Sequence, residues 1–356
     1  MIFEQLNPSS CKTYLLADDD LKQAILIDPV INHVTMYLDL MKERGYQLTH
    51  IIDTHTHADH ISACPSLRDA TDCDYVMHEL APSKCVSVRV EDQSELTLIG
   101  KKFKILHTPG HTRDSITILT DKLLFTGDFL FLEDAGAGRD DLPGGNPEDH
   151  WNSLLKLSNI PDDMVVYPAH EYRNRKPSDM KTQREKNPHL KIKTKEAFIL
   201  YINDLKLGPA DWMKDVLNAN YKCSTDPNAA WIPTDLPACE IKGTMNPNTD
   251  DIEVKYISPP KFKDHIKNNP NILLLDVREK YELSDQLGHI DNVMNIPIGT
   301  LTSHLDKLNS YADGNIILIC RSGARATSAA KILTTAGFLH VYVLEGGMIN
   351  YRLHGL

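Results

Sequence analysis

The chain has 356 residues, more than one average domain needs, so we expect two hydrophobic cores. Its 41% hydrophobic and 24% charged residues suit a globular protein, and no apolar stretch approaches the roughly 20 residues of a membrane span. A net charge of -11 without a long basic run argues against nucleic acid and favours small-molecule chemistry. The N-terminus lacks a basic start followed by an apolar run, which predicts a cytoplasmic protein.

The first 170 residues alternate short β-rich runs with turn signals, and polar side chains repeatedly follow the end of a run. We expect these strand-end loops to converge on one edge. The runs are 51–53, 103–106, 123–125 and 164–167, followed in turn by His55, His111, Asp128 and His170.

Helices are predicted to begin at the Asn146-Pro147 cap and to cover about 194–206 and 209–220, before a proline-rich connector. The last hundred residues restart an α/β rhythm, with strands at 272–275, 316–319 and 341–344 and a helix at about 326–335. Strand-helix-strand order predicts a parallel sheet in this part of the chain.

Three histidines and an aspartate lie within six residues: His55, His57, Asp59 and His60. His and Asp fill strands poorly, and each would need its own buried partner, so metal binding is the economical explanation. The pattern resembles the metallo-β-lactamase superfamily, which implies a four-layered α/β/β/α sandwich with metal at one edge of its sheets. With His111, Asp128 and His170 the set of ligand positions is complete. A complete set permits two zinc ions, so ligand count alone does not identify the metal.

Segments 136–142, 167–172 and 185–188 narrow the resemblance to the persulfide dioxygenase branch, over about residues 1–240. That resemblance implies one ferrous iron per chain, held by two histidines and one aspartate with open positions for sulfur and dioxygen. The ligands carry over to His55, His111 and Asp128. The remaining positions become an outer shell, or a second metal site: His57, Asp59, His60 and His170.

Arg139 is a candidate for binding the carboxylates of a small thiol, because a guanidinium binds carboxylate through two parallel hydrogen bonds. Tyr172 and Arg173, which follow His170, are weaker candidates for the same pocket. The alternative for Arg139 is a solvated loop arginine.

Residues 256–356, after a linker at 241–255, resemble a rhodanese domain in four motifs: 276–279, 288–290, 320–325 and 344–348. Cys320 lies between a buried strand and a helix, where backbone N–H groups are expected to favour a thiolate and then a persulfide. Arg321 and Arg325 add positive charge. Four residues separate Cys320 from Arg325, a length associated with sulfur substrates, whereas related phosphatases carry one more.

Cys320 is one of seven cysteines, an odd number without close pairs, which predicts that most are reduced thiols and do not form a disulfide framework. The others are expected to be inert: Cys11, Cys64, Cys73, Cys85, Cys223 and Cys239.

Together the two resemblances imply that glutathione persulfide or a similar thiol persulfide reacts with dioxygen and water, giving sulfite and the thiol. Cys320 would then pass sulfane sulfur between thiosulfate and a thiol, in a direction that the sequence leaves open, as it leaves the oligomeric state. Two alternatives stay open. One is a binuclear zinc thioester hydrolase of the glyoxalase II type, fused to a rhodanese domain. The other is a non-catalytic persulfide-binding sensor.

Overall fold

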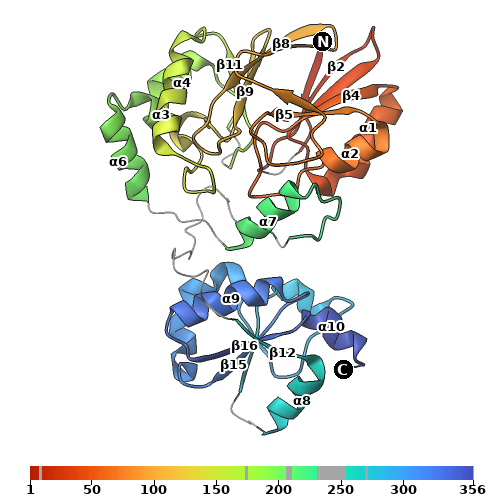
Figure 1. Ribbon diagram of the computed structural model, residues 1–356, viewed down its shortest axis with the longest axis vertical. Coiled ribbons are helices and arrows are strands. Elements are labelled where there is room, and N and C mark those ends of the chain that lie inside the picture. The colour runs from red at the N-terminus through yellow and green to blue at the C-terminus, as the bar shows by residue number, and fades with distance from the viewer. Residues whose placement is uncertain are drawn as a thin grey trace. The chain divides into compact units, whose positions relative to one another are not determined.

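The computed structural model describes residues 1–7, 10–172, 175–205, 211–230, 232, 254–268 and 272–355. These residues form two compact units, one in the chain up to residue 232 and one from residue 254 onward (Figure 1). The predicted linker at 241–255 lies almost entirely outside the described residues, so its boundaries stay predictions. No helix in the described part of the chain is long and apolar enough to cross a membrane.

The first unit contains two sheets. One has six strands in sequence order, with β1 to β3 antiparallel and β3 to β6 parallel: β1 (Ile2–Gln5), β2 (Tyr14–Asp18), β3 (Gln23–Ile27), β4 (Gln47–Ile52), β5 (Asp74–His78) and β6 (Val88–Val90). The other has the order β11-β10-β9-β8-β7, with β10 and β11 parallel: β7 (Glu95–Leu98), β8 (Lys101–His107), β9 (Ile116–Thr120), β10 (Leu123–Gly127) and β11 (Val165–Pro168).

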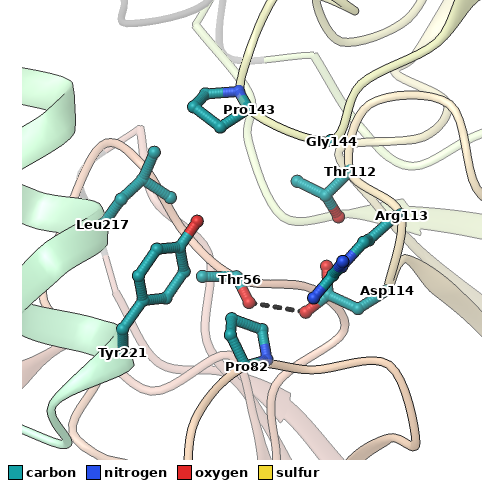
Figure 2. Close-up of a pocket in the computed structure, with 9 residues that line it drawn as sticks. All are labelled: Thr56, Pro82, Thr112, Arg113, Asp114, Pro143, Gly144, Leu217 and Tyr221. Carbon is teal, nitrogen blue, oxygen red and sulfur yellow. Dashed lines mark hydrogen bonds between the residues drawn. The ribbon is translucent and has the colours of Figure 1, made fainter.

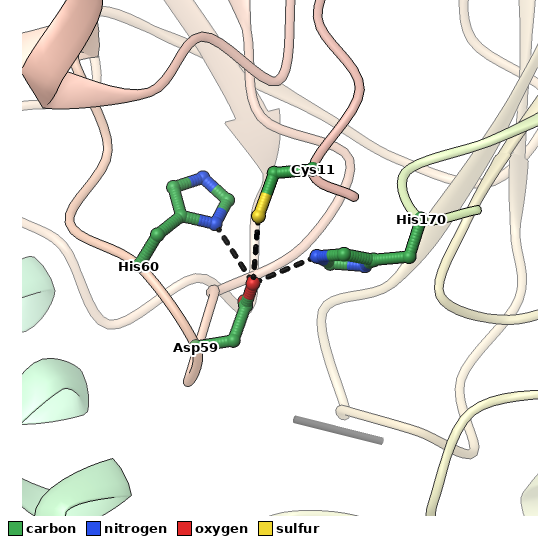
Figure 3. A group of neighbouring side chains, drawn as sticks. All are labelled: Cys11, Asp59, His60 and His170. Carbon is green, nitrogen blue, oxygen red and sulfur yellow. Dashed lines mark hydrogen bonds and ion pairs between the residues drawn. The ribbon is translucent and has the colours of Figure 1, made fainter. Parts of the chain in front are cut away.

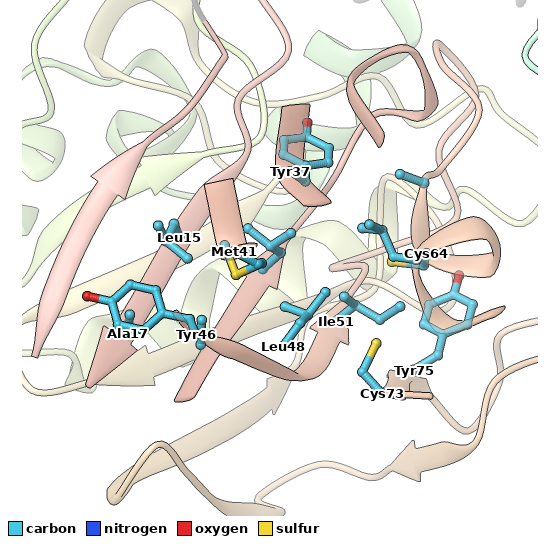
Figure 4. Close-up of a cluster of buried hydrophobic side chains, with 14 of the residues drawn as sticks. Leu15, Ala17, Tyr37, Met41, Tyr46, Leu48, Ile51, Cys64, Cys73 and Tyr75 are labelled. Atoms are coloured by element: carbon cyan, nitrogen blue, oxygen red, sulfur yellow. The ribbon is translucent and has the colours of Figure 1, made fainter. Parts of the chain in front are cut away.

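Alternation along β2 shows how the two sheets are packed. Tyr14 and Leu16 face the core between the sheets, whereas Leu15 and Ala17 face the helices outside the first sheet. Successive strand residues point to opposite faces, so a strand covered on both sides must be apolar throughout. The outer core packs under α1 (Val34–Arg44) and α2 (Cys64–Thr71), as Figure 4 shows.

The second sheet is covered by its own helices, whose apolar residues form a further core. Asn146 caps α3 (Pro147–Lys156), since its side chain accepts the N–H groups of Glu148 and Asp149, as predicted. This completes an α/β/β/α sandwich and confirms the predicted fold. The remaining helices of the unit are α4 (Met180–Lys186), α5 (Pro188–Lys191), α6 (Lys195–Leu205) and α7 (Asp211–Tyr221).

The second unit has one five-stranded sheet in which all pairings are parallel, as predicted. Its strand order is β12-β16-β15-β13-β14, and β13 is buried at every residue. The strands are β12 (Lys255–Ile257), β13 (Leu273–Asp276), β14 (Met294–Asn295), β15 (Asn315–Ile319) and β16 (His340–Leu344). The α-helices are α8 (Pro259–Asn268), α9 (Ala324–Thr335) and α10 (Gly347–Leu353), and 3-10 helices cover Lys280–Ser284 and Ile298–Tyr311.

The prediction of inert, reduced cysteines is wrong for one pair, because Cys85 and Cys223 form a disulfide. They lie 138 residues apart, and only the fold brings them together. The spacing of cysteines along the chain holds no such information. Cys239 lies outside the described residues. The free cysteines among the described residues are Cys11, Cys64, Cys73 and Cys320.

Candidate functional site

The structure brings together the three residues predicted to hold iron. His55 follows β4, His111 follows β8 and Asp128 follows β10, and their donor atoms all lie within 4.8 Å of one another. Oδ2 of Asp128 is 3.9 Å from Nε2 of His55 and 3.7 Å from Nε2 of His111. The Nε2 atom of His55 is buried without a hydrogen-bond partner. Such an atom is costly unless a ligand completes it, so these residues fit a metal ion.

The protonation states of these residues suit metal binding. Burial, with the neighbouring His57, lowers the pKa of His55 well below its usual range, so the imidazole is neutral at pH 7. Burial opposes ionisation of Asp128, but His170, with His55 and His111, holds its pKa well below the usual range. A neutral histidine and an ionised carboxylate can bind a cation without first losing protons.

Backbone around residue 139 orients the second histidine. Nδ1 of His111 lies 2.6 Å from the carbonyl oxygen of Arg139, an arrangement that directs Nε2 toward Asp128. Gly138 makes this close approach possible, because an added Cβ would lie 2.2 Å from the carbonyl oxygen of Asp128 and 2.9 Å from Nδ1 of His111. The glycine therefore serves the packing of the ligand loops.

A second group of side chains surrounds Asp59 (Figure 3). Oδ2 of Asp59 is 2.7 Å from Nε2 of His170, 3.1 Å from Nδ1 of His60 and 3.5 Å from the sulfur of Cys11. Nδ1 of His170 lies 2.5 Å from Oδ1 of Asp128. The imidazole of His170 thus links a predicted iron ligand to Asp59.

The charges of this second group balance one another. Burial opposes protonation of His170, but Asp128, Tyr172 and Asp59 raise its pKa well above the usual range. Burial likewise opposes protonation of His60, while Asp59 raises its pKa to about 9. Both imidazoles are therefore cations at neutral pH in the absence of metal, with Asp59 between them.

His57 lies beside both groups, since the centroid of its ring is 4.2 Å from that of His55 and 4.1 Å from that of His60. Its Nε2 atom lies 3.3 Å from Oδ1 of Asp28 and 3.7 Å from Oδ1 of Asp53. Burial opposes its protonation, yet the two carboxylates beside the ring raise the pKa of His57 well above its usual range. Of the four predicted outer residues, Asp59, His60 and His170 share one cluster. His57 forms a further group of potential ligands with Asp28 and Asp53, and its Nδ1 atom lies 3.9 Å from Oδ1 of Asp59.

The predicted substrate residues have structural partners. Arg139 is 3% exposed, and its guanidinium binds Asp141 at 2.6 and 2.8 Å. The ring of Tyr172 stacks on His170 at a centroid distance of 5.6 Å. Arg173 lies outside the described residues. A role for these residues in substrate binding stays a prediction.

Two residues of the site have no signal in the sequence. Cys11 reaches Asp59 because it forms an isolated β-bridge with His170. The side chain of Asn220, on α7, donates to the carbonyl oxygens of His57 and His60 at 2.8 and 2.9 Å. Single residues so far along the chain from their partners match no spacing motif.

A pocket of about 250 Å³ lies beside the loops that carry His55 and His111 (Figure 2). Its floor includes Thr56, whose hydroxyl donates to Oδ2 of Asp114 at 2.5 Å. One wall comes from α7. The lining residues are Thr56, Pro82, Thr112, Arg113, Asp114, Pro143, Gly144, Leu217 and Tyr221.

In the second unit, Cys320 directly follows β15 and is 1% exposed. The backbone N–H groups of Gly323 and Ala326 donate to its sulfur at 3.1 and 3.4 Å, which is the expected cradle at the start of α9. Burial nevertheless raises the pKa of Cys320, and the hydrogen bond from Ala326 and the charge of Arg325 only oppose that rise. The predicted stabilisation of the thiolate is therefore outweighed by burial.

The two arginines near Cys320 have acidic partners. Arg325 is bound at 2.5 and 2.7 Å by Glu282, so a carboxylate balances its positive charge. Arg321 is exposed and lies 3.5 Å from Asp285. The motif at 276–279 has a structural role, since the guanidinium of Arg278 binds Asp276 and the carbonyl oxygen of Gly288.

Comparison with known proteins agrees with this architecture. Residues 6–84 and 86–170 match the Metallo-beta-lactamase superfamily, and residues 258–354 match the Rhodanese-like domain. Persulfide dioxygenase ETHE1, mitochondrial, of Homo sapiens is 31% identical over 228 residues, or 63% of this chain and 88% of the relative. A hydroxyacylglutathione hydrolase of Prochlorococcus marinus is 35% identical over 162 residues, or 42% of this chain and 62% of the relative.

Two solved structures are similar as well. The crystal structure of ETHE1 from Myxococcus xanthus has a TM-score of 0.60 and 38% identity, covering 63% of this chain and 99% of that one. A metallo-beta-lactamase from Staphylococcus aureus has a TM-score of 0.61 and 20% identity, covering 97% of this chain and 99% of that one, and shows likeness of fold.

Fold and motifs together define a metallo-β-lactamase domain followed by a rhodanese-like domain. The predicted architecture is confirmed in both halves. Within the superfamily, the chain belongs to the ETHE1 persulfide dioxygenase family.

Proposed function

We propose that this protein uses one ferrous iron to oxidise glutathione persulfide, with dioxygen and water, to sulfite and glutathione. The iron would be held by His55, His111 and Asp128. The observation that carries the proposal is the group formed by these three residues, whose donor atoms lie within 4.8 Å of one another and which includes the buried, unpartnered Nε2 atom of His55. Two histidines and one carboxylate form a face with open positions, as non-haem iron oxygenases use.

Iron bound in this face would supply the redox chemistry that joins dioxygen to the terminal sulfur of the substrate. The protein residues supply position and charge. The imidazole of His170 lies between Asp128 and Asp59 and holds the Asp128 carboxylate with its other oxygen directed at His55 and His111. Burial of all three donors keeps bulk water from their surroundings.

We propose that Cys320 carries sulfane sulfur for the same substrate. Its thiolate would attack the outer sulfur of thiosulfate, so that the S–S bond breaks, sulfite leaves with the bonding pair and a Cys320 persulfide forms. A glutathione thiolate would then take that outer sulfur and release the Cys320 thiolate. The reverse sequence would make thiosulfate from persulfide and sulfite.

Metal analysis of protein purified without oxygen tests the proposal, together with dioxygen uptake on adding glutathione persulfide. We expect about one iron per chain and uptake only with persulfides. The rival is a hydrolase, which the likeness to hydroxyacylglutathione hydrolases and the donors around Asp59 favour. Two zinc ions per chain, hydrolysis of a glutathione thioester and no dioxygen uptake would establish the rival instead.

A further inference from the structure

The disulfide between Cys85 and Cys223 joins two segments that lie far apart in the sequence. Cys85 lies in the loop between β5 and β6, and Cys223 comes two residues after the end of α7. Both cysteines are partly exposed, so a small reagent in solution can reach them. The other described cysteines are free, which makes this pair a distinct feature rather than part of a disulfide framework.

The end of α7 is attached to the candidate metal site. Asn220, three residues before Cys223, binds the carbonyl oxygens of His57 and His60 and accepts the N–H of Ser62 at 3.0 Å. The backbone oxygen of Asn220 accepts the hydroxyl of Ser83 at 3.0 Å. A bond that fixes the end of this helix therefore also supports the loop that begins at His55.

Both sides of the disulfide are also held by hydrogen bonds. Arg68 donates to the carbonyl oxygen of Cys85 at 2.6 Å, and Arg89 donates to those of Ala81 and Ser83 at 2.9 and 2.7 Å. Cys223 has a left-handed backbone with φ of 56°, and its N–H donates to the carbonyl oxygen of Asn220 at 3.0 Å. Opening of the disulfide would remove the covalent link between the loop and the end of α7, and hydrogen bonds alone would then hold the two segments together.

The surroundings of the disulfide suit an anionic thiol. Exposed lysines, Lys84 and Lys222, directly precede the two cysteines, and neither makes an ion pair with any residue that the structure describes. The backbone N–H of Cys85 donates to the sulfur of Cys223 at 3.2 Å. This hydrogen bond would stabilise a thiolate on Cys223, which makes Cys223 the leaving group and the sulfur of Cys85 the point of attack.

We propose that the Cys85–Cys223 disulfide is a thiol-exchange site, opened by an anionic low-molecular-weight thiol of the glutathione class, and that opening weakens metal retention. The incoming thiolate forms a bond to the sulfur of Cys85, the Cys85–Cys223 bond breaks, and Cys223 leaves as a thiolate. A second thiolate then takes the first thiol off as its own disulfide and leaves both cysteines reduced. No other oxidant or reductant is needed.

Mass spectrometry of the full-length, metal-loaded protein tests the exchange. Protein purified without reductant is treated with reduced glutathione, alkylated under native conditions and digested. We expect Cys85 and Cys223 to be unlabelled before treatment. Early in the treatment we expect one glutathionyl group on Cys85 with alkylated Cys223, and later alkylation of both cysteines. Free thiols at both positions before treatment, or no adduct and no alkylation after it, would overturn the proposal.

A paired variant tests the role of charge. Lys84→Ala with Lys222→Ala should slow exchange with glutathione about two- to fivefold, because the field that attracts an anionic thiol is removed. Exchange with 2-mercaptoethanol, which carries no carboxylate, should not change. An equal effect on the two reagents, or none on either, would contradict recognition of an anionic thiol.

Metal retention tests the consequence and does not depend on the oxidation reaction. Transfer of the bound metal to a chelator should be about three- to tenfold faster after glutathione treatment. This change is smaller than the one expected when a residue in direct contact with a metal ligand is removed. The variant Cys85→Ser/Cys223→Ser should lose metal at the faster rate with or without glutathione. Cys73→Ser, which alters a cysteine outside the disulfide, should respond to glutathione as the wild type does. Equal retention in the reduced and oxidised protein would contradict the link to the metal site.

Discussion

The two candidate centres are built in different ways. The metal centre collects side chains from loops that follow β4, β8 and β10, and each side chain is held by another side chain or carbonyl group. The Cys320 centre uses one continuous loop, whose own backbone N–H groups contact the sulfur. A centre assembled from distant segments depends on many partners, whereas a contiguous loop depends on its backbone and its nucleophile. Substitutions should therefore separate the two halves cleanly.

The largest effect should come from Asp128→Ala. It removes a predicted metal ligand that lies beside His55, His111 and His170. We therefore expect loss of metal and at least a hundredfold loss of persulfide-dependent dioxygen uptake. This exceeds the roughly 10–100-fold effect of changing a residue that only contacts a ligand. His111→Ala should do the same. Sulfur transfer from thiosulfate, measured in parallel, should persist because Cys320 belongs to a separate compact unit. Loss of both activities together would contradict this independence.

The reciprocal change is Cys320→Ser. A serine hydroxyl stays protonated at neutral pH and cannot carry sulfane sulfur, so transfer between thiosulfate and glutathione should fall to background. Dioxygen uptake with added persulfide should remain. With thiosulfate and glutathione alone, wild type should take up dioxygen and the variant should not. Uptake by the variant under those conditions would show that Cys320 does not supply the persulfide.

Asn220→Ala tests how far the metal centre depends on a remote residue. It leaves two buried carbonyl oxygens, those of His57 and His60, without their donor, at a cost of about 2–4 kcal/mol in the free energy of unfolding. Chemical denaturation of the first unit measures this cost. Asn218→Ala, an exposed position on the same helix, is the matched control and should change stability little. Equal effects of the two substitutions would show that the side chain of Asn220 does not stabilise the site.

Arg139→Ala should raise the KM for glutathione persulfide about three- to tenfold while kcat changes less, as expected when a binding contact away from the reacting sulfur is lost. The metal should stay bound, since His111 contacts the backbone oxygen of residue 139 and not its side chain. If thermal stability falls and KM does not change, the role of Arg139 is structural and consists of its ion pair with Asp141.

The smallest expected change concerns the pH profile of Cys320. Because burial raises its pKa, the thiolate fraction and the rate of alkylation by iodoacetamide should still rise with pH above the usual range of a thiol. Glu282→Gln removes the charge that balances Arg325, so the profile should move to lower pH. Alkylation at pH 7 as fast as that of a low-pKa thiol would contradict the dominance of burial.

The sequence predicts some features of these two centres and misses others, for physical reasons. Strand-end positions predict that His55, His111, Asp128 and His170 lie at a common edge, whereas the choice of three of them as iron ligands rests on the family resemblance. They do not show that His57 faces Asp28 and Asp53, because side-chain direction in a loop depends on tertiary partners. The disulfide between Cys85 and Cys223, the contact of Cys11 with Asp59, and the burial that raises the pKa of Cys320 depend on packing in the same way.

The bond from Asn220 to the metal loop also has a consequence for synthesis. His57 precedes Asn220 by 163 residues, so the loop that begins at His55 cannot gain this support until almost the whole first unit has been translated. A nascent chain ending before α7 would contain every predicted iron ligand but would lack the Asn220 side chain that binds the carbonyl oxygens of His57 and His60. Metal loading should therefore follow release of α7 from the ribosome.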